Sequence, residues 1–235
     1  MCARYMAEKV KENSEETKID EELSGLNIKI RKKELTWIIG VMVFLIVVLF
    51  LTFYLSQSVN TFTYDTLKFE KQLYGEVPVY VYGYTFKDIT GSAVQEYRYQ
   101  LLLRLDPRKN EIPVTGEITL NTYGRDLYIS VNTTGFDLCS TTSRDLATLS
   151  GFLTANLFDV HGGVPDKEAA REANATYITC EEYPQKTVLT IQTGEQSEIR
   201  KIADSCYQLT IANCETVNVI EKLEVQSLID AKKRK

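Results

Sequence analysis

Histidine is almost absent from this sequence: among 235 residues there is one, His161. A single imidazole excludes zinc sites built from several histidines, and no two of the five cysteines have the C-x-x-C spacing of thioredoxin-type redox centres. A zinc site made from the four C-terminal cysteines is not expected either, because the arguments below place them in an oxidising compartment. We therefore predict no metal site and no cofactor.

Common catalytic motifs are missing as well. The sequence contains no G-x-x-x-x-G-K-[ST] or G-x-G-x-x-G loop for phosphates, and no G-x-S-x-G nucleophile elbow. His161-Gly162-Gly163 is similar to the oxyanion loops of some α/β-hydrolases, but the elbow and a second histidine are lacking, so we predict a plain loop over 159–164. Glu181 and Glu182 are adjacent, but neighbours on a strand point to opposite faces of the sheet, so these two carboxylates should not share a catalytic site. We predict no catalytic residue.

The sequence also lacks a second long hydrophobic run: only one run is long enough to cross a membrane. It begins at Leu35, ends at Leu55 and contains no charge. About 20 apolar residues in a helix span the ~30 Å core of a bilayer. About 34 residues precede the run and no A-x-A-like site follows it, so a membrane anchor is favoured over a cleaved signal peptide.

Basic residues flank this run on one side only. Lys29, Arg31, Lys32 and Lys33 precede it, whereas the next charge after it is Asp65. Basic residues near a membrane end stay in the cytoplasm. We therefore predict a cell-membrane protein that contacts the lipid bilayer through residues 35–55, with its N-terminus inside and its C-terminal part outside.

The cysteines agree with this orientation, since Cys2 alone precedes the run. An even number in an oxidising compartment predicts two disulfides among Cys139, Cys180, Cys206 and Cys214, with three connectivities. If 206–214 is one continuous strand, its ends lie about 26 Å apart, which is too far for Cys206 to bond Cys214. Two N-x-[ST] sequences make Asn132 and Asn174 glycosylation candidates.

Composition and periodicity divide the chain into five parts: a largely disordered cytoplasmic tail (1–34), the membrane helix (35–55), a stalk (56–64), an α+β domain (65–231) and a basic tail (232–235). The predicted domain has a mainly antiparallel sheet and two or three helices. The formal net charge of −5 is typical of an acidic soluble surface and excludes a nucleic-acid partner.

Within the domain, apolar residues recur with period two in strands and period 3.6 in helices. Strands are predicted at 77–86, 97–105, 117–121 and 127–131 as an antiparallel meander, and again at 176–181, 187–192 and 207–211. Helices are predicted at 146–160, with Thr142 as N-cap and Asp145 near the dipole, and at 165–173. A closing helix is predicted at about 217–228, although Val217, Val219 and Val225 would also suit a strand.

Tyrosine is concentrated at the start of the domain, where six of the fourteen fall between Tyr74 and Tyr99. Tyr80, Tyr82 and Tyr84 share one face of a predicted strand and form a candidate contact surface for a protein or glycan. The alternative, which we favour, is that helices cover this row and that the rings stabilise the sheet as cross-strand pairs.

Three functions compete on this evidence. We favour a non-enzymatic, single-pass membrane protein whose outer domain acts in binding or assembly with a protein partner. The second hypothesis is a pilin-like filament subunit, although such proteins are processed at a small residue just before the apolar run and residues 31–34 are all charged here. The third is a membrane-tethered hydrolase that uses a carboxylate pair.

The orientation can be tested by protease protection. Because basic residues precede the apolar run, we expect protease added to intact cells or right-side-out vesicles to digest the C-terminal domain and to spare residues 1–34. Immunoblots with antibodies to each end provide the measurement. Protection of the C-terminal domain together with loss of the N-terminal tail would contradict the orientation.

Overall fold

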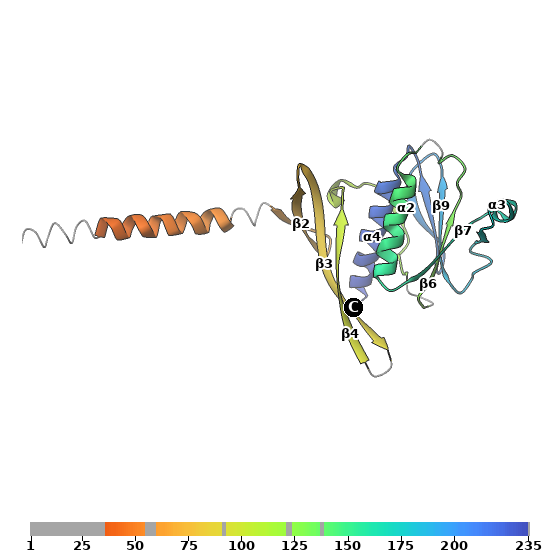
Figure 1. Ribbon diagram of the computed structural model, residues 1–235, viewed down its shortest axis with the longest axis horizontal. Coiled ribbons are helices and arrows are strands. Elements are labelled where there is room, and N and C mark those ends of the chain that lie inside the picture. The colour runs from red at the N-terminus through yellow and green to blue at the C-terminus, as the bar shows by residue number, and fades with distance from the viewer. Residues whose placement is uncertain (1–35, 55–59, 91–92, 121–123, 137–138, 235) are drawn as a thin grey trace, which may run out of the picture. The chain divides into compact units, whose positions relative to one another are not determined.

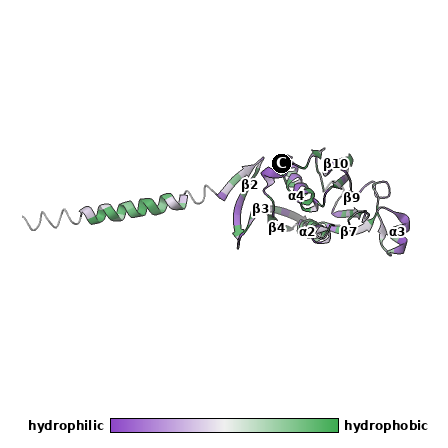
Figure 2. Cartoon of the chain, turned by 90° about the horizontal axis from the view of Figure 1, so that it is seen from above, coloured by the Kyte–Doolittle hydropathy of each residue, from purple (hydrophilic) through white to green (hydrophobic). Residues whose placement is uncertain are grey.

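The computed structural model describes residues 36–54, 60–90, 93–120, 124–136 and 139–234. The chain divides into two compact units, Met1–Val59 and Asn60–Lys235. In the first unit the described part is a helix over Thr36–Tyr54, long and apolar enough to cross a membrane, with none of its apolar window buried. Its surface is hydrophobic along most of its length (Figure 2). The predictions for 1–34, for Leu35 and Leu55, and for residues 56–59 of the stalk lie outside the described residues.

The second unit begins with an antiparallel sheet of four strands in the order β1-β2-β3-β4. The strands are β1 (Thr61–Tyr64), β2 (Leu67–Tyr74), β3 (Val77–Thr90) and β4 (Ala93–Leu103). The predicted hairpin is confirmed, with Tyr84 opposite Tyr99 and Phe86 opposite Tyr97. Residues 61–64 were assigned to the stalk, but they pair with β2, where the rings of Phe62 and Phe69 stack at 5.7 Å.

A second sheet has seven strands in the order β5-β10-β11-β9-β6-β7-β8. They are β5 (Val114–Thr115), β6 (Asp126–Val131), β7 (Asp159–Val164), β8 (Thr176–Tyr177), β9 (Thr187–Thr193), β10 (Glu198–Ala203) and β11 (Cys206–Ile211). Every pairing is parallel except that of β10 with β11. The α+β class and the antiparallel sheet are confirmed, but the mainly antiparallel description is wrong for this larger sheet.

The predicted meander was therefore too long. Its fourth strand, β6, belongs to the larger sheet, and the chain at 117–120 is irregular where a strand was predicted. The physical reason is the connection after β6: parallel strands need a crossover, and helix α2 (Thr142–Ala155) supplies it between β6 and β7.

Two helices lie between the two sheets (Figure 1). They are α2 and α4 (Thr216–Lys233), while α3 (Lys167–Glu172) and a short 3₁₀ helix (Pro107–Lys109) lie elsewhere. Leu149 and Leu223 from these helices join Leu67 and Leu103 of the small sheet and Leu189 of the large sheet in one buried cluster. This main core therefore runs through three layers, and a second, smaller cluster contains Ile178, Val188 and Cys206. The N-cap of α2 is Thr141, one residue before the predicted Thr142.

The segment predicted as a loop over 159–164 is strand β7, paired on both sides. Glycine makes this packing feasible: a Cβ built on Gly163 would lie 2.2 Å from the carbonyl oxygen of Thr176 and 2.6 Å from Ile178 Cδ1. A Cβ on the neighbouring Gly162 would meet nothing within 4 Å. The two glycines suggested a flexible connector, but one of them allows close strand approach.

These glycines provide a matched pair of variants. Gly163→Ala should lower the free energy of unfolding by about 1–3 kcal/mol, because its methyl group meets backbone that cannot rotate away. Gly162→Ala should leave that free energy unchanged or slightly raised. Denaturant unfolding of the full chain, followed by circular dichroism, measures both. Equal stability of the two variants would contradict the parallel pairing of β7 with β8.

Candidate functional site

A cavity of about 510 Å³ lies between β3 and the C-terminal ends of α2 and α4. This volume falls within the ~300–1,000 Å³ typical of small-molecule sites. It is lined by Tyr82, Tyr84, Thr85, Phe86, Leu120, Phe152, Asn156, Phe158, Ser227, Leu228, Ala231, Lys232 and Arg234. The three elements thus combine apolar walls with two basic side chains.

One wall of the cavity is aromatic because β3 alternates its side chains. The rings of Tyr82 and Tyr84 stack at 5.7 Å, and those of Tyr84 and Phe86 lie 6.2 Å apart. Tyr80, on the same face, is only 8% exposed and belongs to the core. Of the three tyrosines predicted as a contact surface, two therefore line the cavity and one packs inside. The row faces the helices.

Polar groups in the cavity wall bond to one another. The Tyr84 hydroxyl donates to Asn156 Oδ1 at 2.8 Å, and Asn156 Nδ2 donates to the Phe152 carbonyl at 2.8 Å. Ser227 Oγ donates to the Glu224 carbonyl at 2.8 Å. Burial raises the pKa of the Tyr84 phenol far above its ordinary value, so the ring stays neutral. The hydroxyl groups of Tyr84 and Ser227 and the amide of Asn156 are therefore engaged by protein partners.

The end of α4 brings positive charge to the cavity. Lys232 and Arg234 are exposed and line it, so they lie at its mouth. The Lys232 ammonium donates to the Thr66 carbonyl at 2.6 Å, and Arg234 Nη1 lies 3.5 Å from Glu117 Oε1. Residues 232–235 were predicted as a separate tail, but α4 continues through Lys233, whose Nζ donates to Asp65 at 2.9 Å.

A buried charge cluster connects the end of β4 to both helices. Arg104 bonds Asp145 of α2 at 2.7 Å and lies 3.6 Å from Glu221 of α4. Glu221 also accepts the backbone N–H groups of Arg104 and Leu105 at 2.8 and 3.0 Å. Burial first, and the charge of Glu221 second, raise the pKa of Glu224, one turn later, to about 8, although Arg104 opposes the shift. At neutral pH Glu224 is therefore mostly protonated.

Sequence reasoning missed this cluster, although α4 carries a pattern that could have found it. Val217, Glu221, Glu224 and Leu228 follow one another at spacings of four, three and four, so they share one face of the helix. A glutamate on the apolar face of a helix predicts either a paired carboxylate or a neutral one. The structure contains both.

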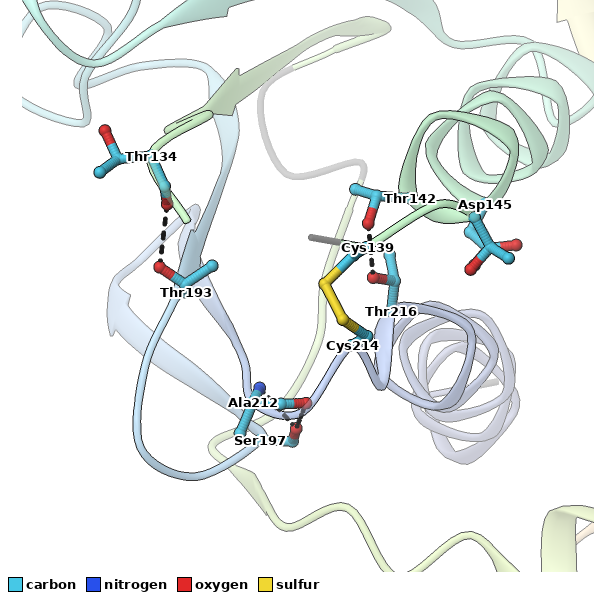
Figure 3. The surroundings of a disulfide bond; sticks show 10 residues. Thr134, Cys139, Thr142, Asp145, Thr193, Ser197, Ala212, Cys214 and Thr216 are labelled. Carbon is cyan, nitrogen blue, oxygen red and sulfur yellow. Dashed lines mark hydrogen bonds between the residues drawn. A yellow bond between two sulfur atoms is a disulfide. The ribbon is translucent and has the colours of Figure 1, made fainter. Parts of the chain in front are cut away.

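The four C-terminal cysteines form two disulfides in this structure. Cys139, before α2, bonds Cys214, before α4, with the Cα atoms 5.3 Å apart (Figure 3). Cys180 bonds Cys206 with a Cα separation of 5.9 Å. The premise of a continuous strand over 206–214 is wrong: β11 ends at Ile211, and Asn213 and Cys214 have φ of 50° and 59°. The chain turns there, which brings Cys214 to the helix start.

The remaining candidates lie away from the cavity residues. Asn132 follows β6, half-buried, and its Oδ1 accepts the Thr134 N–H at 3.1 Å, while Asn174 is exposed after α3. His161 stacks on Tyr128 at 4.8 Å, with its Nε2 3.9 Å from Asp126 Oδ1. Within the described residues, no group of three or more His, Cys, Asp or Glu side chains could hold a metal ion. Glycosylation of either asparagine stays a prediction.

Glu224 gives the domain a specific pH dependence. Its pKa is about 8 when folded and near 4.5 when unfolded, so the unfolded state is the more ionised between these values. Stability should therefore fall as pH rises from about 4.5 to 8. Glu224→Gln should exceed the wild type by roughly 2–4 kcal/mol above pH 8.5 and match it within about 1 kcal/mol near pH 4.5.

Thermal unfolding of the full chain across this pH range provides the measurement, and the exposed Glu195→Gln is the matched control. Glu221 also has a raised pKa, so some slope should persist in the Glu224 variant. An unchanged pH slope in Glu224→Gln would show that this carboxyl is ionised in the folded protein.

No protein-family model, curated protein or solved structure matches this chain.

Proposed function

We propose that this chain is a single-pass membrane protein whose domain outside the cytoplasm binds a small, largely apolar molecule and performs no catalysis. The observation that carries the proposal is the 510 Å³ cavity with its aromatic wall. A mostly apolar cavity of this volume, with a few polar side chains in its wall, is typical of small-molecule binding sites.

Three features support the membrane anchor and its orientation. The side chains of Thr36–Tyr54 are exposed along the whole helix, including Phe50 at 72% and Tyr54 at 76%. An isolated apolar helix of this kind is unfavourable in water and stable in a bilayer. Four basic residues just before the helix favour an inside N-terminus, and the two disulfides suit an oxidising compartment.

The composition of the cavity favours binding over hydrolysis. No aspartate or glutamate is among the described residues that line it. Glu221 and Glu224, one turn apart on α4, are both buried, and Glu221 accepts two backbone N–H groups. A glycosidase-type mechanism requires two carboxyl groups that both reach substrate.

Filling the cavity tests the proposal. We expect Ala231→Trp to reduce ligand occupancy at least fivefold, because the indole would occupy space that Ala231 leaves open. Ala147→Trp, the same change on the exposed face of α2, is the matched control. Ala231→Leu is a milder second variant if the tryptophan disturbs folding.

A long-chain alcohol carrying a photoreactive diazirine is the probe, added to the full chain in lipid nanodiscs. After irradiation, mass spectrometry should find labelled peptides from β3 and the end of α4 in the wild type and in Ala147→Trp. The Thr36–Tyr54 peptide, which faces lipid if the anchor is correct, serves as internal reference. Labelling of that helix without labelling of the cavity peptides would overturn the binding proposal.

A further inference from the structure

We infer that the ligand is a single-chain amphiphile with an anionic head, whose chain lies against Tyr82 and Phe86 and whose head binds Lys232 and Arg234. This inference rests on the proposed function and specifies the ligand class. It follows from the apolar side chains of the cavity walls and from the basic side chains at the cavity mouth.

The walls are mainly apolar and therefore favour an apolar chain. Phe86, Phe152 and Phe158 present hydrocarbon, while Tyr84, Asn156 and Ser227 direct their polar atoms at protein partners. A sugar or nucleotide would lose its hydrogen bonds to water inside such a cavity without replacing them. A volume suited to a drug-sized molecule accommodates one chain rather than a lipid with two.

The mouth presents the cationic side chains Lys232 and Arg234, whereas the nearby carboxylate of Asp230 is buried and accepts hydrogen bonds from Ile118 N–H and Gln226 Nε2. Lys233 forms an ion pair with Asp65, and Arg234 forms one with Glu117. The Lys232 ammonium, by contrast, donates to the uncharged carbonyl of Thr66. The C-terminal end of α4 contributes about half a negative charge, which is less than the one full charge that Lys232 supplies. An anionic head is therefore complementary to this mouth.

Charge also decides against a cationic ligand. Aromatic walls such as those formed by Tyr82 and Tyr84 can bind a quaternary ammonium group. Here any such group would pass Lys232 and Arg234, and like charges at a rim select against the wrong partner. The aromatic side chains therefore contact the apolar chain of the ligand and not its head.

The test compares probes that have the same photoreactive chain and different heads: palmitate, the alcohol of the previous experiment, and lysophosphatidylglycerol. In the full chain in nanodiscs at low salt, at least one anionic probe should label the cavity peptides about fivefold more than the alcohol does. Lys232→Gln/Arg234→Gln should remove this advantage, so that the anionic probes and the alcohol label the cavity peptides to about the same extent. Lys167→Gln/Arg171→Gln on α3 is the matched control.

Salt provides a second measurement on the wild type, independent of whether the variant folds. Raising NaCl should weaken labelling by the anionic probes and not by the alcohol. Preference for palmitate would identify a free carboxylate as the head, and preference for lysophosphatidylglycerol a phospholipid; either supports the inference. Alcohol labelling as strong as that of both anions, insensitive to salt, would overturn the anionic head but leave the binding proposal intact. Absence of cavity labelling by all three probes would overturn both.

Discussion

The position of α4 between two sheets is the constraint on which the rest of the domain depends. A helix covered on both sides must bury most of its surface, and ten of the 18 residues of α4 are buried. Three of these are acidic, so each needs a hydrogen-bond donor or a proton. Glu221 accepts the backbone N–H groups of Arg104 and Leu105, which directly follow β4. Asp230 accepts the Ile118 N–H at 2.9 Å, and Glu224 stays mostly protonated at neutral pH. Burial of the helix therefore determines both the attachment of the small sheet and the charge state of the interior.

The cavity is a consequence of the different lengths of strands and helices. At ~3.3 Å per residue, the 14 residues of β3 extend about 46 Å. At ~1.5 Å per residue, α2 and α4 extend only about 21 and 27 Å, so the hairpin of β3 and β4 projects past them (Figure 1). The aromatic face of β3 continues where the helices end, and their C-terminal residues close the space only in part.

Local patterns predicted individual elements well and their partners poorly. Period two located β3, β4, β9 and β11, and period 3.6 located α2 and α4, because both periods depend only on neighbouring residues. The parallel pairing of β6 with β7 and β9 joins strands separated by helices and loops, which no local period reports. For the same reason the tyrosine row was recognised from sequence, whereas Asn156, Phe158 and Lys232, which complete the cavity, were not.

By itself, the sequence determined the apolar helix, the shift from helical to strand periods and the α+β class, since each follows from hydrophobicity and spacing along the chain. Only the tertiary structure decided that Tyr80 is core while Tyr82 and Tyr84 reach a cavity, and that Cys139 meets Cys214 across 75 residues. It also decided that Glu224 loses contact with water. Each of these depends on which distant surface packs against the residue, and that information is spread over the whole fold rather than held in any one segment.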